Sequence, residues 1–572
     1  MLTNKNKGNN ISFCIMCIIC VCLILAVGFF SICYCEFPST TTDELAYLSQ
    51  AARYAGLNAK DLMSYYAFYG QGISILWAVL FPIFKYNPIH IYKAIIILNC
   101  IFIIISLFIS MKCGKILFPQ TDKLKRMFSA LVVLVYPCNF YNMQLATPEC
   151  LLWLLFWCCF LCINLYLESR KSRYVIALSF FMSVMLIVHF RTIVFAGITI
   201  LFWGGLLCIK KTKIKDLIIL AGIFLLGYGG FQILKHGHYE YVEVVNSITQ
   251  GNIDFNYFEL LKVILGNIRS YLETILYELS YFILVGSIPF IFIFKRLYGI
   301  VKLKNVYKKN ELISISYLLI LFMANLCAFS MGQVTGPARY DSVVYARYVE
   351  YLIGPIIYLG INYAINENEK IGGLKILIIS AVTEGIVIRI YLKMLTAENR
   401  IFAVDSAVGL GGFIGYWSKE EDVLKGLLLA YISLILILII YNYCIDKNRQ
   451  KQVWLLALLT IFWGSTGIKA NIYNWENREI LRTEYYEVRD ELEGVDNTLI
   501  VYIRDEEVMP LCIEGKYVQW AILDKGSIAV MNRQDIEDNI DKNFTYITSH
   551  QVEIPNISRE VSFENRRIRI YK

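Results

Sequence analysis

The feature that most constrains this chain is a recurrence of apolar runs about as long as a bilayer is thick. A helix needs about 20 mostly apolar residues to cross a hydrocarbon core of about 30 Å, and such runs recur from Ile11 to about residue 470. Of the 572 residues, 57% are hydrophobic and 17% are charged, whereas a soluble domain has about 25% charged residues. The sequence therefore predicts an α-helical polytopic membrane protein.

The first run, Ile11–Cys33, has a second interpretation as a cleaved signal peptide. It is longer than the apolar region of a typical signal peptide and lacks a clear pair of small residues at a cleavage site. We therefore interpret this run as a retained membrane span.

Lys and Arg between the runs predict the topology, because cytoplasmic loops carry an excess of them. Placing every basic cluster in the cytoplasm gives about 13 spans, a cytoplasmic N-terminus and an extracytoplasmic tail. The basic clusters lie at residues 5–7, 112–126, 170–173, 210–215, 295–309 and 447–451. The expected spans are 11–33, 88–110, 127–142, 150–167, 174–190, 192–209, 216–234, 271–294, 311–330, 348–365, 374–392, 423–443 and 453–470. The weakest is 374–392, which contains Glu384 and Arg389; losing it would move the tail to the other side.

These patterns divide the chain into a multi-span membrane domain, residues 1–470, and a soluble extracytoplasmic domain, residues 471–572. The tail begins with a charged helical stretch, Glu476–Glu493. Short β-branched and aromatic runs between polar turns then predict a small α/β domain. These runs are Thr498–Ile503, Tyr517–Leu523, Ser527–Met531, Phe544–Thr548 and Arg567–Tyr571.

The first outer loop, about residues 34–87, carries the most informative motif. Asp43 and Glu44 follow Thr42, which can cap a helix, and apolar residues then recur at near-helical spacing. We expect an amphipathic helix on the outer membrane surface that presents two adjacent carboxylates. A simpler explanation is that acidic residues suit the positive end of a helix.

An acidic Asp-Glu pair just after the first span, followed by a surface helix, resembles the GT-C superfamily of membrane glycosyltransferases. The similarity is to bacterial members of the protein O-mannosyltransferase and aminoarabinose-transferase type. The segment from Tyr65 to Asn99 resembles the part of such enzymes where a Tyr-Gly-rich turn leads into a second helix. Here we expect 71–84 to be a juxtamembrane or re-entrant helix and 88–110 to be the span.

Later segments extend the resemblance along the membrane region. Thr147-Pro148-Glu149 and His189-Phe190-Arg191 lie at expected outer span boundaries. The segment from Gly336 to Gly360 resembles an Arg-Tyr sequence at the start of a late span with a following proline.

The resemblance implies a polyprenyl-phosphate sugar as donor and a hydroxyl of the acceptor as nucleophile. It assigns Asp43 as the base that removes the hydroxyl proton, with Glu44 as its partner. Arg suits the leaving phosphate, because its planar donors bind two oxygens at once. The expected substrate-binding residues are Glu149, Arg191, Arg339, Arg347, Tyr348 and Tyr66. Interfacial Arg and Tyr also occur in membrane proteins without any catalytic role.

The predicted function is transfer of a sugar from a polyprenyl-phosphate donor to a cell-envelope glycan, lipid or protein on the outer face of the membrane. The motifs assign no cofactor, and a role for a divalent cation stays open. The alternatives are a transporter or flippase of lipid-linked glycans, a non-catalytic envelope-assembly protein, and a glycan polymerase or ligase. The net charge of +8 is explained by cytoplasmic loops and anionic lipid, not by nucleic acid.

Overall fold

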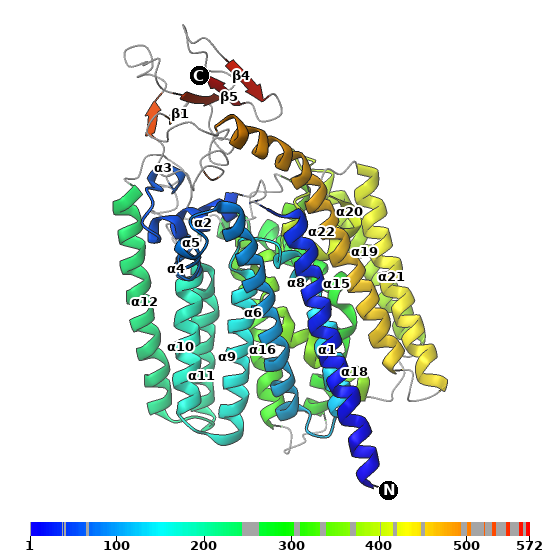
Figure 1. Cartoon of the computed structure of the whole chain (residues 1–572). Helices are drawn as coiled ribbons and strands as arrows, with labels where there is room; N and C mark the ends of the chain where they lie inside the picture. Colours follow the sequence, from blue (N-terminus) through cyan, green and yellow to red (C-terminus); the bar gives the residue numbers. More distant parts are fainter. Residues whose placement is uncertain are drawn as a thin grey trace.

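In the computed structural model of the protein, the described residues are 2–36, 38, 42–63, 68–242, 262, 264–302, 309–331, 339–366, 373–400, 402–415, 420–447, 452–492, 500–504, 520, 529–532, 545–549, 560–563 and 568–571. Most of them form a bundle of long helices (Figure 1). The long helices are α1 (Leu2–Tyr34), α6 (Pro88–Leu117), α9 (Glu149–Ser169), α10 (Arg173–Val188), α11 (Ile193–Cys208), α12 (Ile214–Val242), α15 (Ile268–Lys302), α16 (Lys309–Ser330), α18 (Ile353–Asn366), α19 (Gly373–Met394), α21 (Glu420–Lys447) and α22 (Gln452–Glu491).

Among the described residues, seven helices are long and apolar enough to cross a membrane, or eight if a bent pair within α15 is one span. The chain is therefore a multi-pass membrane protein, as its apolar runs predict. Helices cover each of the 13 expected spans, but several of these helices are too short or too polar to meet the same criteria. The expected number of 13 is not established by the helices themselves.

Two expected spans are interrupted by proline or glycine. The region 127–142 forms two helices, α7 (Lys123–Leu134) and α8 (Pro137–Asn142), because proline at the first position of α8 has no N–H to continue a helix. The expected span 271–294 lies in α15, which bends by 101° between Ile268–Gly286 and Ile288–Lys302. Gly286 has non-helical dihedral angles and Pro289 follows it.

Short helices gather at the end of the bundle that also carries the C-terminal strands, and the N-terminus lies at the opposite end (Figure 1). They come from segments far apart in sequence, so this end is where distant residues meet. They are α2 (Thr42–Tyr54), α3 (Lys60–Met63), α4 (Gly72–Ala78), α5 (Leu80–Ile83), α17 (Arg347–Glu350) and α20 (Val408–Ile414), with the 3₁₀ turns η1 (Phe190–Thr192), η4 (Tyr340–Val344) and η5 (Val404–Ser406).

Helix α2 begins at Thr42 as expected, but it does not lie open on a membrane surface. Leu45, Leu48 and Ala52 have no exposed area, and the helix packs against α4. Each residue from 44 to 52 is buried, so both its apolar and its acidic faces contact protein. The expected second helix is the pair α4 and α5, and α6 begins at Pro88 with the Asn87 side chain as its cap.

The tail contains one five-stranded mixed sheet in the order β2-β1-β3-β5-β4. β1 lies parallel to β2 and β3, and the β3–β5 and β5–β4 pairs are antiparallel. The strands are β1 (Ile500–Arg504), β2 (Ala529–Asn532), β3 (Thr545–Ser549), β4 (Glu560–Phe563) and β5 (Ile568–Tyr571). Four match expected runs, β4 was not expected, and the run Tyr517–Leu523 falls outside the described residues except for Trp520. Helix α22 runs without a break through the expected boundary at residue 470.

Candidate functional site

The guanidinium group of Arg347 is the centre of a cluster of carboxylates. Its Nη1 atom lies 2.9 Å from Oδ2 of Asp43 and 2.8 Å from Oδ2 of Asp405, and its Nε atom lies 3.2 Å from Oε1 of Glu149. These acids come from α2, η5 and α9, so one side chain joins three distant segments. A backbone hydrogen bond from the Ala346 N–H to the Ser406 carbonyl, 2.8 Å long, holds the start of α17 beside η5.

A second guanidinium shares the same glutamate. Nη1 and Nη2 of Arg191 each lie 3.3 Å from Oε1 of Glu149. The Arg191 guanidinium carbon also lies 5.6 Å from the ring centre of Tyr348 and 5.4 Å from that of Tyr351, within cation–π range. Three carboxylates therefore share two guanidinium groups at this site.

The segment around Gly70 fixes where Arg191 lies. The Phe190 N–H donates to the Tyr69 carbonyl at 2.6 Å, and the Gln71 N–H donates to the Ile187 carbonyl at 2.9 Å. Gly70 has a φ of +142°, and a Cβ there would lie 2.5 Å from the Val188 carbonyl oxygen. Only glycine permits this close approach, which accounts for glycine in the Tyr-Gly-rich turn.

The exposure of the three acids differs. The side chain of Asp43 is 25% exposed, against 5% for Glu149 and 9% for Asp405. Burial raises the pKa of Asp43 above its ordinary value, although Arg347 acts in the opposite direction. Burial lowers the pKa of Arg347, but Glu149, Asp43 and Asp405 outweigh that effect and hold it well above its ordinary value. Asp43 is thus the accessible acid of the cluster, beside a permanent cation.

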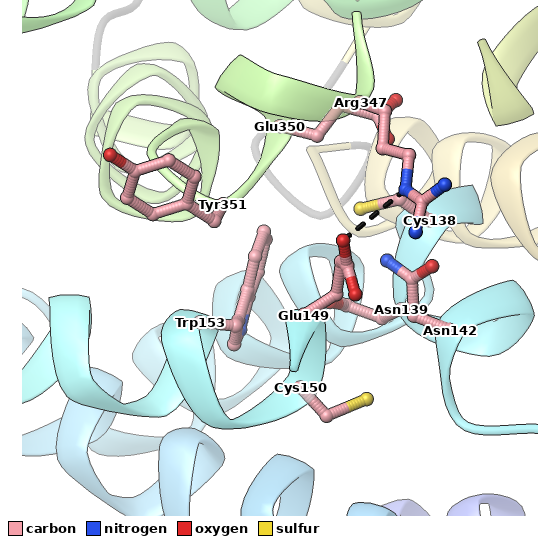
Figure 2. Close-up of a pocket in the computed structure, with 9 residues that line it drawn as sticks. All are labelled: Cys138, Asn139, Asn142, Glu149, Cys150, Trp153, Arg347, Glu350 and Tyr351. Carbon is pink, nitrogen blue, oxygen red and sulfur yellow. Dashed lines mark hydrogen bonds and ion pairs between the residues drawn. The ribbon is translucent and has the colours of Figure 1, made fainter. Parts of the chain in front are cut away.

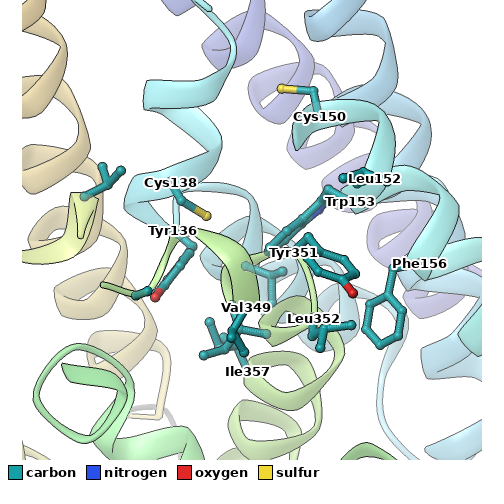
Figure 3. Packing of buried hydrophobic residues seen from close by; sticks show 14 of the residues in the cluster. Tyr136, Cys138, Cys150, Leu152, Trp153, Phe156, Val349, Tyr351, Leu352 and Ile357 are labelled. Carbon is teal, nitrogen blue, oxygen red and sulfur yellow. The ribbon is translucent and has the colours of Figure 1, made fainter. Parts of the chain in front are cut away.

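A narrow pocket is lined in part by Glu149 and Arg347 (Figure 2). It has room for about one water molecule. Its lining residues are Cys138, Asn139, Asn142, Glu149, Cys150, Trp153, Arg347, Glu350 and Tyr351. Two of the lining residues, Trp153 and Tyr351, belong to a cluster of packed apolar residues from α9 and from the segment 349–357 (Figure 3).

Glu44 points away from this cluster. Its Oε2 atom lies 3.3 Å from Nη2 of Arg478 in α22, and its Oε1 atom lies 2.5 Å from the Tyr92 hydroxyl and accepts the Ala146 N–H at 2.7 Å. Adjacent helical residues point about 100° apart, so the two acids of the motif serve two different networks.

The remaining expected residues lie in different places. Tyr348 contacts Arg191, as described above. Arg339 forms a 2.8 Å ion pair with Asp341, is 40% exposed, and does not appear among the described contacts of Arg347. Tyr66 lies outside the described residues. The structure therefore brings together Asp43, Glu149, Arg191, Arg347 and Tyr348, and not Glu44 or Arg339.

Two participants were not singled out from the sequence. Asp405 lies in an expected outer loop and no motif distinguishes it, and Arg478 lies within the charged helical stretch Glu476–Glu493. Arg478 is 1% exposed. Its spacing from Asn471 and Asn474 on one helical face was the available signal.

Metal binding has little support within the described part of the chain. No group of three or more His, Cys, Asp or Glu side chains there is arranged to hold a metal ion. The carboxylates of the Arg347 cluster instead face guanidinium groups.

The structure is similar to solved structures of a membrane transferase. Crystal structures of ArnT from Cupriavidus metallidurans match at 10% identity over 97% of each chain, with TM-scores of 0.55 for the form bound to undecaprenyl phosphate and 0.52 for the apo form. The apo oligosaccharyltransferase of Archaeoglobus fulgidus matches at 11% identity over 95% of this chain and 70% of that one, with a TM-score of 0.43. No protein-family model and no curated protein sequence matches. The similarity to ArnT confirms the fold that the sequence resemblance implies: this chain is a helical multi-pass membrane protein with the fold of ArnT.

Proposed function

We propose that the protein is a glycosyltransferase that moves a sugar from a polyprenyl phosphate to a hydroxyl of a cell-envelope acceptor. The observation that carries this proposal is the difference in exposure within the Arg347 cluster. Asp43 is the most exposed of the three carboxylates that contact Arg347, so an acceptor can reach it. The donor class is supported by the similarity in fold to ArnT, which was solved with undecaprenyl phosphate.

In this mechanism Asp43 takes the proton of the acceptor hydroxyl as that oxygen attacks the anomeric carbon. General-base catalysis of this kind contributes roughly 10²–10⁴-fold to rate. Arg347 lies 2.9 Å from Asp43 and favours its ionised form, which opposes the effect of burial on its pKa. Arg347 therefore limits the rise in pKa that burial causes, while a quarter of the Asp43 side chain stays exposed.

The leaving polyprenyl phosphate gains charge as the glycosidic bond breaks. Arg191 and Arg347 would stabilise that charge, because guanidinium groups in a dry site act strongly on developing anions. Glu149 contacts both side chains and would hold them in place, with Tyr348 packed on Arg191. Arg339 at 40% exposure and Tyr66 are assigned to the approach of donor and acceptor.

The proposed topology follows the positive-inside rule. It has about 13 spans in residues 1–470, a cytoplasmic N-terminus, and an extracytoplasmic α/β domain in residues 471–572 that would help to select the acceptor. The reaction then takes place on the outer face. The scheme neither requires nor excludes a divalent cation.

The test is sugar transfer by purified protein in detergent, with a panel of polyprenyl-phosphate sugars and envelope extracts as acceptors. We expect transfer by the wild type and a loss of at least about 100-fold in Asp43→Asn. Glu311→Gln is the matched control, because Glu311 is also a partly buried acid bound to an arginine, Arg296, at 2.8 Å. Equal transfer by wild type and Asp43→Asn would refute the base assignment. Donor translocation without transfer would favour a flippase.

A further inference from the structure

The ion pair between Glu44 and Arg478 is among the most deeply buried in the described part of the chain, with side-chain exposures of 0% and 1%. Burial of two charges is costly, so such a pair is weak support for stability; its best-attested use is to fix register between segments. The two residues are 434 positions apart, which makes the pair a direct tie between the first outer loop and α22.

The same carboxylate also holds the segment that leads to the shared glutamate of the site. The Ala146 N–H donates to Glu44 at 2.7 Å, and Ala146 lies three residues before Glu149. Tyr92 of α6 joins the network through its hydroxyl, which lies 2.9 Å from Nη1 of Arg478. Glu44 thus orients two elements of the Arg347 cluster, α2 and the start of α9, without contacting the cluster.

Helix α22 is held along one face. Asn474 accepts from Nε of Arg478 at 3.4 Å, and Asn471 accepts from the Gln144 side chain at 3.0 Å and donates to the Phe140 carbonyl at 3.2 Å. Positions 471, 474 and 478 lie on one side of a helix. That side therefore binds α8 and the segment that follows it, as well as α2.

The same helix continues outward toward the tail. The Tyr486 hydroxyl donates to Glu36 at 2.6 Å, and α22 ends at Glu491, nine residues before β1. Displacement of the tail would therefore act first on the contact of Tyr486 with Glu36 and then, along the same helix, on Arg478.

We propose that Arg478 is a positioning residue, which sets the orientation of Asp43 through Glu44, and that α22 transmits the position of the tail to the site by this route. Asp43 and Glu44 are consecutive residues in one helix, so a rotation of α2 that releases Glu44 moves Asp43 by a comparable distance. The effect on catalysis rests on the proposed function, whereas the structural link from Arg478 to α2 through Glu44 does not.

The first measurement is hydrogen–deuterium exchange of the amides of α2 and of residues 143–147 in detergent. It compares wild type, Arg478→Gln, the milder Arg478→Lys, and the control Arg296→Gln, which removes a partner of Glu311 far along the chain. We expect faster exchange at both segments in Arg478→Gln, an intermediate rate in Arg478→Lys and no change there in the control. If Arg478→Gln does not fold, Arg478→Lys against the control gives the answer. Wild-type exchange in the Arg478 variants would overturn the proposal whether or not the protein transfers sugar.

The second measurement is transfer kinetics. Misplacement of a reacting group by about 1 Å can cost about 100-fold, so we expect kcat of Arg478→Gln to fall by roughly 10–100-fold. The KM for donor and the pH profile should change little, because Asp43 and the arginines are retained. A loss expressed only in KM, or an equal loss in Arg296→Gln, would overturn the positioning role. A wild type that transfers no sugar would count against the proposed function alone. The exchange result would still decide whether Arg478 holds α2 through Glu44.

Discussion

Asp43 and Glu44 are neighbours in sequence, yet their carboxylates lie in two very different networks. Asp43 shares Arg347 with two other acids and keeps a quarter of its side chain exposed, whereas Glu44 is fully buried and contacts a guanidinium, a hydroxyl and a backbone N–H. Three carboxylates around one guanidinium repel one another, which costs free energy, and one of them is partly exposed. Such an arrangement suits a site that binds a ligand. A closed network with matched donors suits a structural tie. The contrast assigns a catalytic role to Asp43 and a structural role to Glu44, although the two residues are consecutive.

The largest expected loss of stability and activity comes from removing the guanidinium group of the Arg347 cluster. Arg347→Gln would leave Asp43, Glu149 and Asp405 facing one another without their common partner. Loss of one side of a buried ion pair costs about 3–5 kcal/mol, and transfer should disappear. Thermal unfolding in detergent checks this, with Arg296→Gln as the control. A midpoint equal to that of the control would show that the cluster does not need its cation.

Substitution of Glu44 should mainly lower stability, whereas substitution of Asp43 should mainly lower activity. Glu44→Gln should lower stability by about 3 kcal/mol, because Arg478 would stay buried without its counter-charge. Asp43→Asn should change it by less than about 1 kcal/mol, because two other acids still face Arg347, while transfer is lost. Parallel unfolding and transfer assays test the pair. The reverse pattern, a stable Glu44→Gln without activity, would assign the chemistry to Glu44.

Asp341, which lies near Asp405 of the Arg347 cluster, is expected to make the stability of the protein depend on pH. Burial raises its pKa from 3.8 to about 6, against the opposing effect of Arg339. Between about pH 4 and pH 6 the folded state then holds more protons than the unfolded state, so stability falls as pH rises through this window. The contribution is on the order of 2–3 kcal/mol. Asp341→Asn should flatten this part of the stability–pH curve, and a curve with the wild-type slope would contradict the assignment.

The smallest expected effect comes from the turn that places Arg191. Gly70→Ala should cost about 1–3 kcal/mol, because its φ of +142° is strained for any other residue and a Cβ would press on the Val188 carbonyl. Transfer should fall with it, since the turn is bonded to Phe190. Gly56→Ala is an instructive comparison: its φ is +89° with open space around it, so it carries strain without the contact. Equal losses in transfer would mean that the contact with Val188 does not matter.

The sequence predicted much of the membrane fold, for a simple reason. A long apolar helix satisfies its own backbone hydrogen bonds, so runs such as those of α6 and α9 specify local structure without knowledge of neighbours. Proline and glycine also act locally, yet their effects at Pro137 and Gly286 were missed, since an apolar run can cross a membrane either straight or broken. The tail was harder, because short strands such as β4 depend on partners.

Within the site, the sequence determined the residue types and the helix that begins at Thr42. It supplied an acidic pair, an arginine after His189 and an arginine–tyrosine pair at Arg347. Which acid meets which cation was decided only by the tertiary structure, because Arg347 and Arg478 reach α2 from positions hundreds of residues away. One helical step of about 100° then turns Asp43 toward one arginine and Glu44 toward another. Local sequence sets that angle, but packing alone places the partners.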